Sequence, residues 1–198
     1  MLSFTASLSP NSTAFALFVN EKYDYKDAKG ILSKDITKKI DLFLKSLKEK
    51  KQKDEISSLD ISEKKKCFII KIKNKFENYY FEEIGGSFFT YIKNYKTINS
   101  VDIYADSLNE NKDKLSKLFS EFIFGFNLKS YTFNKYKTLN KEKINKKVNY
   151  KIISSNKKNI ENNYKYYHAI KEGVFLARDL VSEPPNILNP KTYVQEIK

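Results

Sequence analysis

The side chains that could perform chemistry in this sequence are few and lie far apart. Cys67 is the single cysteine and His168 the single histidine. Because a protein zinc site draws several ligands from cysteine and histidine, these two residues cannot assemble one. A Ser-His-Asp or Cys-His triad would have to use His168, whose helical spacing predicts a surface position. Cys67 lies in the apolar run Cys-Phe-Ile-Ile and is predicted to be a small buried side chain in a reducing compartment.

The acidic residues do not form a cluster that could hold metal ions. They occur singly or beside lysine, and the pairs Asp54-Glu55 and Glu82-Glu83 are predicted to be solvated. Hydrolysis at a two-metal centre needs several carboxylates that converge on ions about 3.5–4 Å apart. We therefore expect no catalytic, no cofactor-binding and no metal-binding residue in this chain.

The paired glycines Gly85 and Gly86 are the remaining feature with chemical potential. Glycines at the start of a helix can cradle a phosphate group. No complete GxGxxG or Walker pattern accompanies this pair. The sequence therefore favours a turn or a close packing contact over a phosphate site.

Length and composition predict one folded domain with a short extension. The chain has 198 residues, of which 40% are hydrophobic, and this is enough for a buried core. No run approaches the roughly 20 apolar residues that cross a bilayer. The amino terminus lacks the basic start and long apolar core of a signal peptide. We expect a cytoplasmic protein with no membrane partner.

The net charge of +13 raises the question of a nucleic-acid partner. Arg178 is the single arginine, and the lysines are scattered through every segment, many of them beside an acidic residue. This distribution is typical of a solvated surface. The alternative that stays open is an α/β domain that binds nucleic acid through surface lysines, or a nucleotide at Gly85 and Gly86.

Apolar periodicity predicts strands and helices in alternation over residues 1–155. Strands are expected at residues 2–6, 14–19, 56–61, 67–72, 101–105 and 148–152, and helices at residues 35–50, 78–95 and 107–125. A turn is expected at residues 9–12. Ser107 and Glu110 form a predicted capping box, and Gly125 is the predicted C-cap of the same helix. The alternation predicts an α/β layer sandwich with a mixed sheet.

Residues 156–198 are predicted to form a second part of the chain. The polar stretch Asn156–Asn159 is the predicted hinge, and a long helix is expected from Ile160 to Val181. Pro184 and Pro185 end that helix, because each lacks a backbone donor and has a fixed φ.

A new helix is predicted close to the end of the sequence. Glu183 precedes a proline and is expected to be extended. Asn189 and Pro190 have the residue types of an N-cap and a first helical position. Because the sequence stops inside this helix, we expect the polypeptide to be incomplete.

Two passages resemble the leucyl (cytosol) aminopeptidase family. The segment Ala177-Arg-Asp-Leu-Val-Ser-Glu-Pro-Pro-Asn-Ile-Leu-Asn-Pro190 is similar to the family's Ala-Arg-Asp-Leu-Val-Asn-Glu-Pro-Pro-Asn entry into the catalytic domain, with Ser182 in place of the usual Asn. A passage similar to the family's G..L..Y.F..YKT pattern comprises Gly125, Leu128, Tyr131, Phe133, Tyr136, Lys137 and Thr138. Phe124 replaces the family's acidic residue before that glycine. Within this match, Arg178 and Asp179 look like packing or hydrogen-bonding residues at a domain junction.

The resemblance implies a fold and an activity. The fold is a three-layer, macro-domain-like amino-terminal α/β domain with a mixed sheet, followed by a connecting helix and the start of a metallopeptidase domain. The full-length protein would remove N-terminal amino acids from peptides with two divalent metal ions, manganese or zinc, as a homo-hexamer. The family's metal ligands and catalytic lysine lie downstream of the Pro-Pro-Asn segment. The resemblance therefore implies that this chain alone is inactive as a peptidase and binds no metal.

Overall fold

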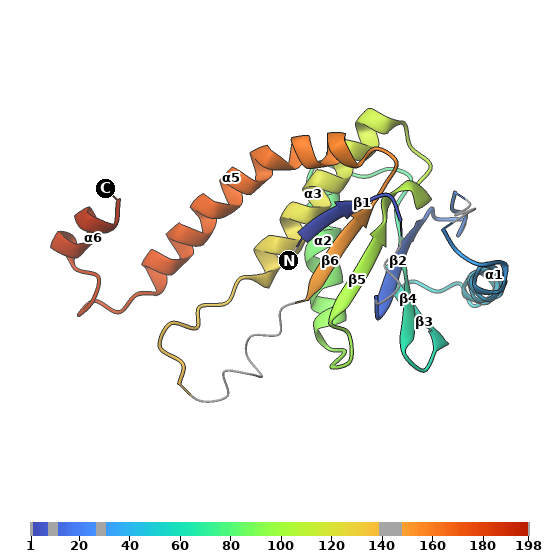
Figure 1. The fold of residues 1–198 in the computed structure, drawn as a ribbon, viewed down its shortest axis with the longest axis horizontal. Coiled ribbons are helices and arrows are strands. Elements are labelled where there is room, and N and C mark those ends of the chain that lie inside the picture. The colour runs from blue at the N-terminus through green and yellow to red at the C-terminus, as the bar shows by residue number, and fades with distance from the viewer. Residues whose placement is uncertain (1, 8–11, 27–30, 139–147, 198) are drawn as a thin grey trace.

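The computed structural model describes residues 2–7, 12–26, 31–138 and 148–197 (Figure 1). Each predicted strand and helix is present in it. The elements are β1 (Leu2–Thr5), β2 (Ala14–Val19), α1 (Lys34–Glu49), β3 (Ile56–Ser62), β4 (Lys65–Lys71), α2 (Tyr80–Lys93), β5 (Ser100–Tyr104), the 3-10 helix η1 (Ala105–Ser107), α3 (Lys112–Ser130), β6 (Asn149–Ile153), α5 (Lys157–Ser182) and α6 (Pro190–Ile197). Apart from Ser12, the turn predicted at residues 9–12 lies outside the described residues.

The strands form one mixed sheet in the order β1-β6-β5-β2-β4-β3. All neighbouring strands are parallel except β3, which pairs antiparallel with β4. Figure 1 shows β1 and β3 at the two edges. β2 lies in the middle, and all six of its residues are buried, because helices cover both faces of the sheet.

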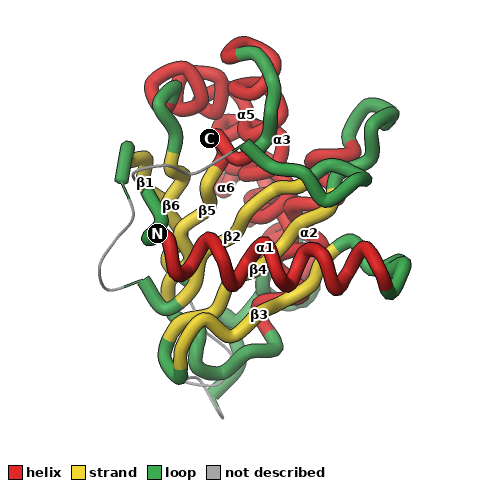
Figure 2. The backbone as a smooth tube through the Cα atoms, turned by 90° about the vertical axis from the view of Figure 1, so that its right-hand side faces the viewer, coloured by secondary structure: helices red, strands yellow, loops and turns green. Residues whose placement is uncertain are grey.

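The helices lie in two layers on opposite faces of the sheet. α1 covers one face, where Ile40, Leu44 and Leu47 pack against alternate residues of β2 and β4. α2 and α3 cover the other face together with the start of α5, as Figure 2 shows. The predicted three-layer α/β sandwich with a mixed sheet is confirmed.

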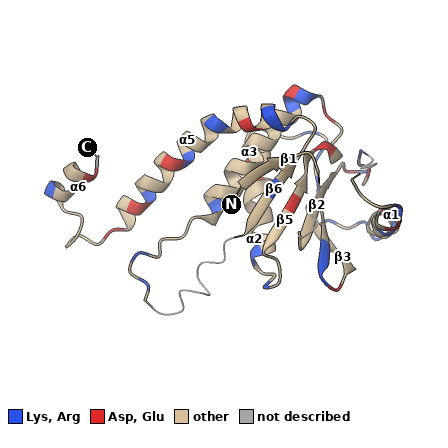
Figure 3. Cartoon of the chain, in the orientation of Figure 1, with Lys and Arg blue, Asp and Glu red and all other residues tan. Residues whose placement is uncertain are grey.

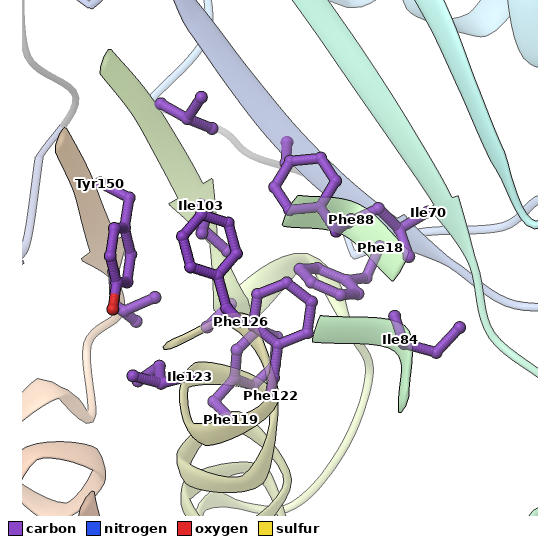
Figure 4. Close-up of a cluster of buried hydrophobic side chains, with 14 of the residues drawn as sticks. Phe18, Ile70, Ile84, Phe88, Ile103, Phe119, Phe122, Ile123, Phe126 and Tyr150 are labelled. Atoms are coloured by element: carbon purple, nitrogen blue, oxygen red, sulfur yellow. The ribbon is translucent and has the colours of Figure 1, made fainter. Parts of the chain in front are cut away.

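The larger core, between the sheet and α2 and α3, is rich in phenylalanine. The rings of Phe18 and Phe119 meet edge to face with centroids 4.8 Å apart, and Phe122 lies 5.4 Å from Phe18 (Figure 4). Edge-to-face contacts place the positive rim of one ring against the negative face of the next. They fix how α3 sits on the central strand.

The predicted ends of α3 are wrong at both termini. Asn111 is the N-cap, because its side chain accepts a hydrogen bond from the Lys114 amide at 2.9 Å. Ser107 instead lies in η1, where its hydroxyl is buried and accepts from the Phe18 amide at 2.8 Å. Gly125 is not a C-cap, since α3 continues through it to Ser130. Tertiary contacts decide both positions, as described below for the glycine.

The predicted hinge at residues 156–159 is the packed beginning of α5. Asn156 is the N-cap residue, and its side-chain amide donates to the Lys112 carbonyl at 2.8 Å. Ile160 is fully buried in the larger core. α5 then runs along α3 and extends beyond the sheet, so that α6 lies far from the strands (Figure 1). The predicted break is confirmed: Glu183 is extended, and Asn189 accepts from the Lys191 and Thr192 amides at the start of α6.

Candidate functional site

Cys67 and His168, which a Cys-His triad would combine, lie on different elements, β4 and α5. Cys67 is fully buried on the α1 face, and burial raises the pKa of its thiol, so the reactive thiolate is disfavoured. The His168 side chain is about half exposed on α5 and lies 3.7 Å from Glu172. Both positions agree with the sequence predictions.

The acidic residues of the described segments do not converge. No group of three or more His, Cys, Asp or Glu residues that could hold a metal ion occurs among them. Glu55 lies 3.5 Å from Lys73 at the surface. The prediction that Glu82 and Glu83 form a solvated pair is wrong for Glu82, whose side chain is half-buried. The pKa of the Glu82 carboxyl is raised, mainly by this burial and further by the negative charges of Glu121 and Glu83.

Gly85 and Gly125 mark a close helix contact, and no turn interrupts α2 there. A Cβ atom on Gly85 would lie 2.1 Å from the Phe122 carbonyl oxygen, and one on Gly125 would lie 1.9 Å from the Glu82 carbonyl oxygen. Both distances are far below contact, so only glycine lets the backbones of α2 and α3 approach this closely. The packing interpretation of the glycine pair is confirmed for Gly85.

A polar site joins the segment after α3, residues 131–136, to the end of α5, residues 175–183. We call it the junction. The Tyr131 hydroxyl donates to Asp179 at 2.7 Å, and the Tyr131 and Phe175 rings pack with centroids 5.1 Å apart. These segments are the two that carry the family resemblance. The structure brings them side by side.

Arg178 and Asp179 of α5 both contact Tyr131 within this junction. The Arg178 guanidinium donates to the Leu128 carbonyl at 2.8 Å and lies over the Tyr131 ring at 5.4 Å. It therefore satisfies an orphan carbonyl near the end of α3. The predicted hydrogen-bonding role of both residues is confirmed.

Glu183 closes the junction next to the Pro-Pro turn. Its carboxylate accepts from Lys135 Nζ at 2.6 Å and from the Tyr136 hydroxyl, and its side chain is 7% exposed. The hydrogen bonds from Lys135 and then Tyr136 hold the pKa of the Glu183 carboxyl below its ordinary value. The sequence predicts that Glu183 is extended but does not reveal this contact, because its partners lie almost fifty residues earlier.

A cavity of about 290 Å³ lies inside the junction. Phe133, Leu176 and Leu180 supply apolar walls, and Lys135 and Glu183 lie at its polar side. Its residues can fix the angle between α5 and the chain that follows. We assign no catalytic step to them.

The structure also contains a hydrogen-bond relay that was not predicted from the sequence. The Tyr150 hydroxyl donates to Asn127 Oδ1 at 2.7 Å, and Asn127 Nδ2 donates to the Tyr164 hydroxyl at 2.7 Å. The relay joins β6, α3 and α5. An asparagine directly after the aromatic-rich residues 122–126 is the signal that could have indicated it.

The lysines are distributed over many elements of the fold. Figure 3 shows Lys and Arg on helices, strands and loops, interleaved with Asp and Glu. Lys114 pairs with Glu110 at 2.7 Å, and Lys66 pairs with Asp60. This arrangement supports the solvated-surface interpretation over a dedicated nucleic-acid face.

No helix in the described segments has both the length and the apolar character needed to cross a lipid bilayer.

Comparison by sequence finds relatives named as cytosol aminopeptidases. No protein-family model matches the chain. The chain is 37% identical to the "Probable cytosol aminopeptidase" of Phytoplasma mali over 117 residues, which make up 58% of this chain and 23% of that protein. It is 35% identical to the protein of the same name from Agrobacterium fabrum over 105 residues, 52% of this chain and 21% of the relative. The matches thus span about a fifth of the length of these relatives.

Comparison by structure finds leucine aminopeptidases and a macrodomain among the similar folds. A mutant of tomato leucine aminopeptidase superposes with a TM-score of 0.72 at 16% identity, over 99% of this chain and 41% of that one. Leucyl aminopeptidase from Leishmania major in complex with actinonin gives 0.58 at 11% identity, over 98% of this chain and 38% of that one. The macrodomain of Thermus aquaticus DarG gives 0.53 at 12% identity, over 78% of this chain and 98% of that one. At such identities these likenesses establish the fold, which is macro-domain-like.

Proposed function

Because the chain is homologous to the amino-terminal region of cytosol (leucyl) aminopeptidases, we propose that it is the amino-terminal portion of a metal-dependent aminopeptidase. The observation that carries this proposal is the junction. The two passages that resemble the family are distant in sequence, yet they meet through Tyr131 with Asp179 and through Lys135 with Glu183. The resemblance therefore covers a three-dimensional unit.

We propose that the polypeptide is divided into two parts with different roles. Residues 1–155 form the amino-terminal domain, and residues 156–198 form the connecting helix and the start of the catalytic domain. The distal part of α5 and α6 exposes large apolar side chains, among them Val181 at 88% and Val194 at 52%. Such a face is usual for a surface that another part of the protein covers. The catalytic domain is the proposed cover.

The proposed hydrolysis needs a metal centre that the residues described here do not provide, since their His, Cys, Asp and Glu side chains form no group of three. We therefore assign the two divalent ions, manganese or zinc, to the catalytic region and derive no metal step from this chain. The role that we propose for this chain is to position the polypeptide that follows α5. The contact between Lys135 and Glu183 fixes the end of α5 and the direction of the backbone at the Pro-Pro turn.

The remaining proposals follow from the family. The substrates of the full-length protein are peptides with a free amino terminus, its assembly is a homo-hexamer, and its compartment is the cytoplasm. The names of the relatives support the substrate class and the compartment.

The test compares two polypeptides from the same gene. The complete reading frame that contains this chain should hydrolyse leucine p-nitroanilide with added Mn²⁺ or Zn²⁺ and lose that activity with a chelator. Residues 1–198 alone should give no turnover above the blank under the same conditions. Metal-dependent turnover by residues 1–198, or none by a folded complete protein, would overturn the proposal.

A further inference from the structure

A groove runs between α2 and the edge strand β3, away from the junction. It has a volume of about 1110 Å³. One wall is formed by α2, including Ser87, Thr90 and Tyr91, and the other by the beginning of β3, including Ile56. Neither the packing of the core nor the proposed peptidase function accounts for it.

The strand that borders the groove is the end of the sheet. β3 is the last strand in the order and pairs with β4 alone among the described segments (Figure 1). An edge strand presents a row of backbone N–H and C=O groups that can pair with another extended chain. The groove thus lies beside a line of available main-chain partners.

The register shows which residues of β3 present those groups. The Lys71 amide donates to the Glu55 carbonyl at 2.7 Å, so this opposed pair is a hydrogen-bonded one. In an antiparallel ladder, hydrogen-bonded and non-hydrogen-bonded pairs alternate. Ile56 opposes Ile70 and Ser58 opposes Phe68. Ile56 and Ser58 therefore direct their amides and carbonyls away from β4, toward the outer edge.

The side chains of the same two residues face α2. Ile56 packs against the core on that face, and the Ser58 hydroxyl lies 3.1 Å from the Tyr95 hydroxyl, just beyond the end of α2. A chain added outside β3 would place every second side chain over the same face, in the groove against α2. In this arrangement, main-chain hydrogen bonds to β3 provide affinity, and contacts of the added side chains with the groove provide specificity.

The charged residues that line the groove indicate which kind of ligand it can bind. The carboxylates of Asp54, Glu55 and Glu83 outnumber the ammonium groups of Lys53 and Lys129 in the lining, although the whole chain has a net charge of +13. The walls favour a neutral or basic segment over an acidic one. We propose that this groove binds an extended peptide of neutral or basic composition, which adds to β3 as a seventh strand.

A second copy of the chain fits the edge less well than a peptide. The ladder shifts register between Asp60 and Ser62, which bends the strand and limits the straight edge to residues 56–60. Two such short edges would pair over few residues. A peptide gains the same main-chain bonds and also fills the groove. The site is independent of the metal centre and of the hydrolysis proposed above.

The test uses residues 1–198 and a fluorescein-labelled, end-capped peptide of sequence Lys-Val-Thr-Val-Thr-Lys. Fluorescence anisotropy should show saturable binding with a dissociation constant in the micromolar range. The same peptide with alternate amides N-methylated should bind at least about tenfold more weakly, because it cannot complete the ladder. A Glu-Val-Thr-Val-Thr-Glu peptide should also bind more weakly, because its charge matches that of the walls.

Two protein variants locate the site. Thr90→Trp fills the groove from an exposed position on α2 and should weaken binding at least about tenfold. Thr37→Trp is the matched control, since Thr37 also lies on a helix and also donates to the carbonyl four residues earlier, but on the opposite face of the sheet. It should leave binding unchanged. Ser58→Pro should weaken binding more than Ser58→Ala, since the proline removes an outward amide without breaking the β3–β4 ladder.

Amide chemical shifts give an independent readout. Addition of the peptide should shift the resonances of Ile56 and Ser58 more than those of the junction. The proposal would be overturned by the absence of binding, by equal binding of the N-methylated peptide, or by equal binding to Thr90→Trp. Dimerisation through β3 in light scattering, with no effect of peptide, would assign the edge to a second copy instead.

Discussion

Gly125 shows how one residue can determine the spacing of two helices. It lies inside α3, where glycine has the poorest intrinsic helix propensity apart from proline. Glycine is required at this position because the Glu82 carbonyl approaches so closely that no Cβ atom would fit. Glycine therefore destabilises α3 locally but permits the close packing of α3 against α2.

Gly125→Ala should therefore destabilise the protein although alanine is the better helix former. The new Cβ would lie 1.9 Å from a backbone oxygen, and the helices must separate to accommodate it. We expect a loss of about 3 kcal/mol or more in the free energy of unfolding, measured by urea denaturation. Gly173→Ala is the matched control, since that glycine lies on α5 with nothing within 4 Å of the added Cβ. It should stabilise by about 0.5–1 kcal/mol. Equal effects at both positions would contradict the packing argument.

Glu183 is the second residue whose role depends on distant partners. Hydrogen bonds from Lys135 and Tyr136 lower the pKa of its carboxyl in the folded state. A lowered pKa means that the carboxylate contributes stability above its unfolded-state pKa of about 4.3. That contribution is lost as the pH falls through the folded-state pKa. The junction should open in acid.

This pH dependence can be measured at the carboxyl carbon of Glu183 by NMR. The pKa should lie below that of a free glutamate, and Lys135→Met combined with Tyr136→Phe should return it toward the ordinary value. The reference group is Glu172, whose pKa is lowered by the hydrogen bond from Lys171. Its titration should not change in the double variant. An unchanged Glu183 titration would remove the proposed contact.

At the scale of elements, a polar seam holds α5 along α3. Its start is fixed by Asn163, whose side-chain amide donates to the Ser116 hydroxyl at 2.9 Å, and its end by Arg178 with the Leu128 carbonyl. Between them lies the relay of Tyr150, Asn127 and Tyr164. Burial raises the pKa of Tyr150 above its ordinary value and that of Tyr164 to about 12, so both hydroxyls stay protonated near neutral pH. The seam sets the direction of α5 more specifically than apolar contacts alone, because hydrogen bonds need one register.

Asn127→Ala should expose how much this relay contributes. It leaves the hydroxyls of Tyr150 and Tyr164 without their partner in buried surroundings, at a cost of about 2–4 kcal/mol in the free energy of unfolding. The cost should be smaller in a Tyr150→Phe background, because one of the two stranded groups is then absent. Urea unfolding of the four members of this cycle measures the coupling. Strictly additive losses would show that the three side chains act independently.

At the scale of the whole molecule, α5 changes its surroundings along its length. Near its start, Ile160 and Tyr164 are buried, whereas Leu176 is 49% exposed and Val181 is 88% exposed. The apolar side chains of this helix are therefore well covered only in its first half by the part of the chain described here. This gradient fits a helix that belongs to one domain at its start and to another at its end.

Hydrogen exchange should follow the same gradient. In residues 1–198, amides of α5 beyond Gly173 should exchange at least about tenfold faster than those near Tyr164, because fewer buried contacts oppose local opening. In the complete reading frame the distal amides should become protected, and the proximal ones should change little. Uniform protection along α5 in the shorter chain would mean that its distal face is already stabilised without a further domain.

Local sequence patterns specify the elements and the class of fold. Continuous apolar runs such as residues 14–19, helical stripes such as Ile40 with Leu44 and Leu47, and the proline break after Glu183 are local signals with local causes, so their positions were predictable. The sequence also carries the family resemblance, through two short passages. The start of α3 was misplaced because Ser107 and Asn111 are both good caps, and only the tertiary contact of Ser107 with Phe18 removes the first from the helix.

Tertiary structure alone decided how the sequence passages meet. The partners of Gly125, Asn127 and Glu183 lie on other elements, and no local pattern encodes a distance between backbones or a hydrogen bond across almost fifty residues. The groove beside β3 has the same origin, since a strand becomes an edge only when the order of the sheet is fixed. Periodicity reports which face of an element is buried. Which element buries it depends on chain topology, and the contacts that carry specificity follow from that choice.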